Sequence, residues 1–548
     1  MIKVLIWNKN KFKYFTNISI NSYDILYQIR VILASIIMSN LIKVLEKIDL
    51  SIYNKFIIPY EGIKKEKEDM MKSLIGKEWR DAKDGKVIEV TNPATGELVD
   101  TVPSLSADEV NEAIDYAYES QKEWEKVPVH ERCDIMMKFV ELVERDKDTL
   151  AKTLSDETGK PIKEAYNEIA NIKIGVPAYV GRVQHDYGNV IPRGTEKGQE
   201  NTIQYTMQQP LGVCVAIIPF NFPSDIFINK IPPALLMGNS AILKPASVNP
   251  LTLTKYVELL VEAGVPAGVI SVVHGSGSVV GKALTSSKKV AIVTLTGSTE
   301  AGIDALKNCA EHLAHSSLEL GGNDAFILCE DGDIDLAVEE TVWGRLYNTG
   351  QVCCASKRFL VQNSVKQEYI DKMMDKINTL KVGYPSEMDT DIGCLISEDA
   401  AKEVEAQVNK TVEQGAKIVY GGRRNGAFYE PTILDGVTRD MDVAKDMEIF
   451  GPVISVIGFD TIEEAVEIAN QSKYGLSGSI ITRDMNKAIK VSEQMECGGF
   501  VINGASFFRS FEQPFGGWKY SGIGNEGIMT TLREMSRTKT VILKNITK

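Results

Sequence analysis

The feature that most constrains the fold is a series of four short apolar segments between residues 213 and 297. They read VCVAIIP (213–219), SAILKP (240–245), VISVVHG (269–275) and VAIVTLTG (290–297). Each is apolar almost throughout, which is typical of a strand buried on both faces of a parallel sheet. Stretches with helical spacing lie between them, for example LTLTKYVELLVEAG at 251–264. The alternation predicts an α/β fold with a doubly wound, Rossmann-like nucleotide-binding domain.

A second set of strand-like segments predicts a further α/β domain. Its members are DAFILCE, SKRFLVQN, AKIVYGG, PVISVIGF, GSIITRD and GGFVINGA. Two isolated strand-like runs, NTIQYTMQQ (201–209) and TKTVILKN (538–545), lie outside both series. We expect these two runs to pair as a protruding β-arm, because an exposed strand edge of this kind finds a partner.

Helix signals precede the first apolar segment. Ser106 and Glu109 form an S-x-x-E capping box before a run with helical spacing. A long helix is predicted over about 130–155, ending before the Gly159-Lys160-Pro161 breaker.

These patterns predict domain boundaries along the chain. We expect a cofactor-binding domain at 71–192 and 210–321, a catalytic domain at 322–520, and an oligomerisation arm and tail at 193–209 and 521–548.

The first 70 residues form an N-terminal extension that is rich in Ile, Lys, Asn and Tyr and poor in Gly and Ala. Their apolar stretch at 31–42 is too short for an untilted membrane span, which needs about 20 residues. Three interpretations are open: an amphipathic helix, an atypical targeting segment, or upstream sequence translated from the wrong start. Our hypothesis is a start at Met70 or Met71, and an intact mass that includes residues 1–69 in protein from the native source would contradict it.

Composition excludes some classes of function. A net charge of -13 argues against binding to nucleic acid or to an anionic membrane. The eight cysteines are dispersed and form no CxxC motif, which predicts a reducing, cytoplasmic location. His312 and His315 lack a nearby Cys or acidic ligand set, so no metal site is predicted, and we interpret both as part of a helix face.

Two glycine-rich turns are candidates for nucleotide contact. HGSGSVVGKAL (274–284) contains Gly275, Gly277 and Gly281 in a G-x-G-x-x-x-G pattern, one residue longer than the Rossmann fingerprint. Alone, this pattern fits a cofactor contact or a plain strand–helix turn equally well. Ala283 stands where a P-loop needs Ser or Thr, which excludes a P-loop hydrolase. In the second turn, Gly297 and Ser298 open a helix whose free N–H groups suit a pyrophosphate.

Lys244 ends a predicted buried strand, at the carboxyl edge where doubly wound sheets bind ligands. A carboxylate shortly after it would bind a ribose diol and repel a 2′-phosphate. Ser247 stands in this stretch and no acid does, so the sequence predicts that NADP is tolerated.

Three residues suggest a reactive site. Glu319 in SSLELGGN precedes a Gly-Gly turn and could serve as a base, and Asn221 in PFNFP could cap a loop or donate to an oxyanion. Cys353 and Cys354 are adjacent in NTGQVCCASKR. Because adjacent side chains diverge, we expect one thiol to face a pocket, but the residues alone do not choose between them, and a buried inert thiol is also possible.

From about residue 75 to the C-terminus, the chain resembles the NAD(P)-dependent, hydrolytic aldehyde dehydrogenases. The motifs that carry the resemblance, in chain order, are PFNFP (219–223), LKPAS (243–247), LTGSTEAG (295–302), LELGGN (318–323), GQVC (350–353), MEIFGPV (447–453) and PFGGWKYSGIGNEG (514–527).

The resemblance implies specific roles in the oxidation of an aldehyde to a carboxylate. Cys353 would be the nucleophile that forms a thiohemiacetal and then a thioester, and Glu319 would activate the hydrolytic water. Asn221 and the backbone N–H of Cys353 would form the oxyanion hole. The family is usually a homodimer or homotetramer, assembled through a β-arm.

The resemblance also implies a set of contacts to NAD or NADP. They are Lys244 and Ser247 at the adenine-side ribose, Gly275, Gly277 and Gly281 at the adenosine end, Gly297 and Ser298 at the pyrophosphate, Glu448 and Phe450 at the nicotinamide ribose, and Phe220 where many members have a Trp.

Departures from the family pattern bear on the substrate. Ser247 replaces a common Glu, which supports acceptance of NADP. Asn229 and Tyr347 stand where succinate-semialdehyde dehydrogenases of the usual type carry arginines that grip the substrate. Arg509, shortly before PFGG, is a further candidate for contact with a carboxylate or phosphate.

Two alternatives are weighed against hydrolysis. In a coenzyme A-acylating semialdehyde dehydrogenase, coenzyme A rather than water takes the acyl group, but such enzymes usually lack the glutamate that this chain has at 319. A catalytically retired structural or binding protein is disfavoured because every catalytic position is intact.

Overall fold

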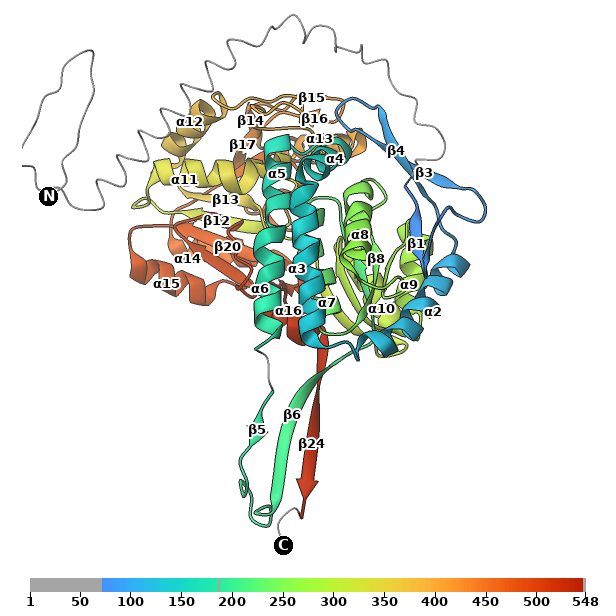
Figure 1. Cartoon of the computed structure of the whole chain (residues 1–548). Helices are drawn as coiled ribbons and strands as arrows, with labels where there is room; N and C mark the ends of the chain where they lie inside the picture. The colour runs from blue at the N-terminus through green and yellow to red at the C-terminus, as the bar shows by residue number, and fades with distance from the viewer. Residues whose placement is uncertain (1–70, 186–187, 546–548) are drawn as a thin grey trace, which may run out of the picture. The chain divides into compact units, whose positions relative to one another are not determined.

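The computed structural model describes residues 71–185 and 188–545 (Figure 1). The described residues belong to one compact unit of the chain. The predicted N-terminal extension and its start-site hypothesis lie outside the described residues. Within the described ranges, none of the helices has the length and apolar character needed to cross a membrane.

The first sheet has eight strands in the order β2-β1-β9-β8-β7-β10-β11-β23. Its parallel centre consists of β7 (Val213–Ile217), β8 (Ser240–Lys244), β9 (Ile270–Val272), β10 (Val290–Thr296) and β11 (His315–Glu319). Its antiparallel edges are β1 (Ser73–Ile75) with β2 (Glu78–Arg80), and β23 (Gly522–Ile523). The prediction of a parallel, doubly wound sheet from the four apolar segments is confirmed.

Both faces of this sheet are covered by helices, which explains why its strands are apolar throughout. Val213 and Val215 pack into the core formed with α2 (Ala107–Trp124), α9 (Lys282–Ser286) and α10 (Thr299–Ala310). Cys214 and Ala216 face the opposite core. That core also contains residues of α3 (Val129–Arg145), α4 (Lys147–Thr158), α5 (Ile162–Ala170), α6 (Ile172–Val183), α7 (Pro223–Leu236), α8 (Leu251–Ala263) and α16 (Ile528–Glu534).

Of the two helix predictions, the capping box at Ser106 is confirmed and the single long helix over 130–155 is not. Ser106 and Glu109 form the predicted reciprocal capping box at the start of α2. The single helix predicted over 130–155 is wrong, because α3 and α4 are separate helices that meet at Asp146, whose φ of -102° and ψ of 11° are not helical. Gly159, with φ of 74°, ends α4 in the left-handed conformation that glycine favours.

The second sheet has seven strands in the order β14-β17-β18-β13-β12-β20-β21. They are β12 (Asp324–Leu328), β13 (Ser356–Gln362), β14 (Lys417–Tyr420), β17 (Thr432–Val437), β18 (Val453–Phe459), β20 (Ser477–Ile481) and β21 (Gly499–Ile502). Residues of α13 (Glu398–Glu413), α14 (Ile462–Asn470) and α15 (Met485–Gln494) share one core with the sheet, and α11 (Ile334–Thr341) and α12 (Lys366–Ile377) share another. All six predicted strands are present, and β17 is a seventh strand that the apolar pattern did not predict.

Shorter elements complete the described part of the chain. They are the hairpin β3 (Val87–Thr91) and β4 (Leu98–Pro103), the pairs β15 (Arg424–Asn425) with β16 (Phe428–Tyr429) and β19 (Tyr474–Gly475) with β22 (Trp518–Lys519), and the short helical turns η3 (Gly277–Gly281), η4 (Val342–Leu346), η5 (Tyr347–Gly350) and η6 (Asp442–Ala444).

The predicted β-arm is present. β24 (Ser536–Lys544) pairs antiparallel with β6 (Thr202–Pro210) along its whole length, and β5 (Val190–Ile191) pairs with the other edge of β6. Figure 1 shows these strands extending away from both sheets. The tail expected at 521–548 divides in two, since β23 and α16 pack on the first sheet and its helices and β24 alone enters the arm.

Candidate active site

A cavity of about 540 Å³ brings together the three catalytic candidates, Asn221, Glu319 and Cys353. They come from the loop after β7, the last position of β11 and the loop before β13. Aromatic side chains form much of the remaining wall: Phe222, Trp343, Phe507, Phe511 and Phe515. Residues far apart in the sequence therefore meet at one site that is large enough for a small organic substrate.

Cys353 follows a turn of unusual backbone conformation. Asn348, Thr349 and Gly350 have φ values of 50°, 55° and 77°, in the left-handed region that non-glycine residues rarely adopt. The backbone N–H of Asn348 donates to Oε2 of Glu164 at 2.8 Å. The buried Arg345 donates to the carbonyl of Gly350 and to two further main-chain carbonyls. These buried bonds hold the strained turn, and a strained backbone that is fixed from several sides is typical of a functional site.

The two thiols differ in ionisation. A hydrogen bond from Cys354, together with the charges of Lys357 and Arg509, lowers the pKa of the half-buried Cys353 thiol against the opposing effect of burial. The pKa of the buried Cys354 thiol is raised well above its usual value by the same bond and by burial. Cys353 is therefore the first of the two to become a thiolate. Both residues contribute to the lining of the cavity, Cys353 half-buried and Cys354 buried.

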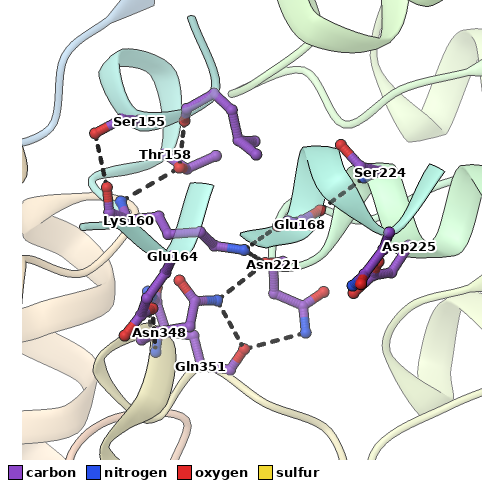
Figure 2. A network of polar contacts seen from close by, with 12 residues as sticks. Ser155, Thr158, Lys160, Glu164, Glu168, Asn221, Ser224, Asp225, Asn348 and Gln351 are labelled. Atoms are coloured by element: carbon purple, nitrogen blue, oxygen red, sulfur yellow. Dashed lines mark hydrogen bonds and ion pairs between the residues drawn. The ribbon is translucent and has the colours of Figure 1, made fainter. Parts of the chain in front are cut away.

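Asn221 is held in place by a buried polar network, shown in Figure 2. Its main-chain carbonyl accepts hydrogen bonds from Nζ of Lys160 and Nδ2 of Asn348, each at 2.9 Å. Its side-chain Nδ2 donates to the carbonyl of Gln351 at 3.1 Å, and Lys160 forms a buried ion pair with Glu168. The amide of Asn221 therefore points toward the loop that carries Cys353.

Glu319 is buried, with 3% of its surface exposed, and neither of its carboxyl oxygens has a hydrogen-bond partner among the described residues. Burial first, and then the charge of Glu526, raise the pKa of Glu319 well above its usual value. A buried carboxyl of raised pKa with both oxygens available is suited to take a proton from water near neutral pH.

The charges of Lys230 and Glu526 act on Glu319. Neither residue was predicted from the sequence to belong to the site. Nζ of Lys230 lies 3.0 Å from Oε1 of Glu526, and Nη2 of Arg509 lies 2.7 Å from Oε2. The two cations lower the pKa of Glu526 despite its burial. Glu526 therefore carries the negative charge that, after burial, raises the pKa of Glu319. The sequence feature that could have pointed to Lys230 is its position as a single lysine within the apolar run IFINKIPPALL of α7.

Most of the predicted cofactor residues lie at the carboxyl ends of β8, β9 and β10, which we term the cofactor edge. Lys244 ends β8 and is buried, which lowers its pKa to about 8. Oγ of Ser247 donates to the carbonyl of Gly275 at 3.0 Å. Gly275 has φ of 145°, and a Cβ there would meet Cγ2 of Val280 at 2.4 Å, so the protein's own packing requires this glycine.

The other glycines of the cofactor edge are not required by the protein's own packing. A Cβ at Gly277 would meet nothing within 4 Å, at Gly281 only Cε of Lys244 at 4.0 Å, and at Gly297 only Leu295 at 3.5 Å. Ser298 caps α10 by accepting from the N–H of Ala301. Glycines beside a helix N-terminus allow close approach of a phosphate to the backbone, and this arrangement fits a dinucleotide.

The remaining cofactor candidates lie near the loop of Cys353. The rings of Phe220 and Phe450 are 5.9 Å apart in an edge-to-face arrangement. Oε1 of Glu448 is 3.0 Å from Nζ of Lys357, which also bonds the carbonyl of Cys353. Within the described residues, the lining of the 540 Å³ cavity includes all three catalytic candidates and none of the ten cofactor candidates. The cofactor candidates therefore lie outside this cavity.

A doubly wound sheet, together with a cavity that holds a cysteine of lowered pKa and a carboxyl of raised pKa, is typical of a dehydrogenase that uses a thiol. The model of the aldehyde dehydrogenase family matches residues 79–541, and the chain belongs to this family.

Characterised relatives agree with this assignment. The chain is 37% identical over 476 residues to the lactaldehyde dehydrogenase of Methanococcus aeolicus, which covers 86% of this chain and 99% of the relative. It is 37% identical over 458 residues to the NADP(+) succinate-semialdehyde dehydrogenase of Escherichia coli, covering 83% and 94%. The crystal structure of betaine aldehyde dehydrogenase from Staphylococcus aureus in complex with NAD+ superposes with a TM-score of 0.84 at 30% identity, covering 87% and 96%.

The protein is thus an NAD(P)-dependent oxidoreductase that oxidises an aldehyde to the acid. The resemblance inferred from the sequence motifs and the predicted α/β fold are both confirmed.

Proposed function

We propose that the protein oxidises a short aldehyde with an oxygen-bearing substituent, through a thioester on Cys353 that water activated by Glu319 hydrolyses. The observation that carries the proposal is the single cavity in which Cys353 has a lowered pKa and Glu319 a raised one, with Asn221 beside them. A lowered pKa favours the thiolate that a nucleophile needs, and a raised pKa makes the carboxylate of Glu319 a stronger base.

In the first step, the Cys353 thiolate attacks the carbonyl carbon, and the electron pair of the C=O bond moves to the oxygen. The N–H groups of the Asn221 amide and of the Cys353 backbone stabilise the resulting oxyanion. The main-chain anchors of Asn221 on Lys160 and Asn348 support this role, because a donor fixed in advance needs no reorganisation during the reaction.

Lys244, Ser247, Gly275, Gly277, Gly281, Gly297, Ser298, Glu448, Phe450 and Phe220 would hold the dinucleotide. When bound, NAD(P)+ supplies the acceptor for the hydride whose loss turns the thiohemiacetal of Cys353 into a thioester.

In the last step, Glu319 takes a proton from water, and the hydroxide attacks the thioester carbon. The C–S bond breaks, which releases the carboxylic acid and restores the Cys353 thiolate. The presence of Glu319 with both oxygens available favours water over coenzyme A as the acyl acceptor. Detection of acyl-CoA as the main product when coenzyme A is added would contradict this choice.

Arg509 supports the proposed class of substrate. It lines the cavity, its guanidinium lies 4.1 Å from the centre of the Phe515 ring, and one nitrogen pairs with Glu526. Burial, and then the charge of Glu168, raise the pKa of the neighbouring Asp225 to about 7, which reduces negative charge in the cavity. The names of the relatives, lactaldehyde and succinate-semialdehyde dehydrogenase, correspond to hydroxyl and carboxylate substituents.

A panel of aldehydes tests this proposal. Lactaldehyde and succinate semialdehyde are compared with apolar aldehydes of equal chain length in the parent and in Arg509→Met. Loss of a hydrogen bond to a charged group is expected to lower kcat/KM for the polar substrates by about 10- to 100-fold, with a smaller change for the apolar ones. An equal loss for both kinds would contradict a role of Arg509 in recognition.

Three further features complete the proposal. Ser247 in place of an acid supports use of NADP as well as NAD. The exposed strands of the β-arm support a homodimer or homotetramer. All eight cysteines are unpaired, which supports a reducing, cytoplasmic location.

A further inference from the structure

A buried lysine connects the reactive cysteine to the proposed cofactor contact Glu448. Lys357 lies on β13, four residues after Cys353, and only 1% of its side chain is exposed. Its Nζ donates to the main-chain carbonyl of Cys353 at 2.5 Å and lies 3.0 Å from Oε1 of Glu448. The same carboxyl oxygen accepts from the N–H of Gly322 at 3.3 Å.

The neighbouring cation has different partners. Arg358 donates to the main-chain carbonyls of Asn323, Ala444, Ile468 and Ala469, so its charge is used to join loops of the second sheet. Lys357 instead contacts the backbone of the reacting residue and a carboxylate. Burial of an ammonium group is unfavourable unless it is paired, so the position of Lys357 is tied to that of Glu448.

The charged and titratable groups around the Cys353 thiol come from several elements. Lys357 on β13 and Arg509 after β21 are the cations. Glu448, Glu319 at the end of β11, Asp324 at the start of β12 and the adjacent Cys354 are the acidic groups. Arg509 is paired with Glu526, and the pKa values of Glu319 and Asp324 are raised by burial. Lys357 and Glu448 therefore form an ion pair that contributes to the electrostatic field at the thiol, in addition to the hydrogen bond from Cys354 and the charge of Arg509.

We propose that Lys357 is a positioning residue that holds the backbone of Cys353 and the carboxylate of Glu448 in one network and supplies positive charge beside the thiol. The inference rests on the proposed function, in which Cys353 is the nucleophile and Glu448 contacts the cofactor. Through Lys357, the acidity of the Cys353 thiol would depend on the position of Glu448, the proposed contact of the cofactor.

The test measures the reactivity of Cys353 in the full-length protein without cofactor or aldehyde. The rate of alkylation of Cys353 by iodoacetamide is followed by peptide mass spectrometry from pH 5 to 10. In Lys357→Met, the pH at which the alkylation rate of Cys353 reaches half its maximum is expected to rise by about one unit. This shift corresponds to about tenfold slower alkylation at neutral pH. Lys357→Arg is expected to keep most of the parental rate, because it keeps the charge.

Two further variants separate charge from general damage to the fold. Lys366 at the start of α12 is a partly buried lysine outside the cavity lining, and its Nζ lies 2.8 Å from Oδ1 of Asp435. The pH dependence of Cys353 alkylation in Lys366→Met is expected to match that of the parent. Glu448→Gln leaves Lys357 in place and removes the opposing charge, so its half-maximal pH is expected to fall. This variant tests the same field even if Lys357→Met unfolds.

The outcomes distinguish this inference from the proposed function. Unchanged pH profiles in both Lys357→Met and Glu448→Gln, with normal alkylation of Cys353 in the parent, would overturn the inference alone. Alkylation of Cys354 instead of Cys353 in the parent would contradict the proposed nucleophile. Titration of NADPH fluorescence provides a second measurement, and weaker binding is expected in Lys357→Met, with recovery in Lys357→Arg.

Discussion

The cofactor edge and the catalytic cavity are held together in different ways. At the cofactor edge, partners are often close in the chain, as where Ser298 caps its own helix and Lys244 donates to the carbonyl of Pro245. In the cavity, partners are distant, since Lys230 and Glu526 are 296 residues apart and the site is assembled from both sheets. Local pattern therefore specifies nucleotide binding, whereas tertiary contacts set the ionisation states on which the chemistry depends.

The largest expected effect separates the two thiols in the cavity. Cys353→Ala is expected to lower kcat for aldehyde oxidation by about a thousandfold or more, because removal of a nucleophile leaves only binding and electrostatic effects. Cys354→Ala is expected to keep the nucleophile and to remain active, with its pH profile shifted to higher pH because the hydrogen bond that lowers the pKa of Cys353 is lost. Steady-state formation of NAD(P)H measures both. Normal turnover in Cys353→Ala with a dead Cys354→Ala would reverse the assignment.

The next prediction tests whether distant buried contacts hold the cavity. Lys160→Met leaves Glu168 buried without its cation, which is expected to lower the free energy of unfolding by about 3–5 kcal/mol. The matched control is Lys152→Met, whose partner is Asp156 and whose side chain is 74% exposed, and a loss of at most about 1 kcal/mol is expected there. Urea unfolding measures both variants, and equal losses would contradict the distinction.

The smallest effect concerns the cofactor edge. Ser247→Glu is expected to raise KM for NADP about tenfold or more relative to NAD, because a carboxylate repels the 2′-phosphate. Ser247→Gln, of similar size without charge, is the control. A ratio that stays the same in Ser247→Glu would show that this position does not face the adenine-side ribose.

This contrast also explains what could be predicted from the sequence. The central strands β7, β8, β9 and β10 were predictable because burial on both faces leaves a continuous apolar run. The arm strands β6 and β24 are largely solvent-accessible, and they were predicted instead as isolated strand-like runs outside both series. The break at Asp146 was not, because it interrupts a pattern that stays helical on both sides. Cys353 and Glu319 were found through local motifs, whereas Lys230 and Glu526 become significant only when the fold places them beside Glu319. From its neighbours in the sequence, Lys357 would be expected to be solvent-exposed. The fold buries it and pairs it with Glu448.

The most direct test of the central claim is a rapid-mixing experiment on Glu319→Gln with NADP+ and a substrate aldehyde. We expect a burst of NADPH that approaches one per active site, because thiolate attack and hydride loss do not need Glu319. Very slow turnover should follow, because hydrolysis of the thioester does need it. In the parent, steady-state turnover should increase with pH as Glu319 deprotonates above the usual carboxyl range, and the variant should lack this dependence. Full steady-state turnover of Glu319→Gln at neutral pH would contradict the assignment of Glu319 as the base.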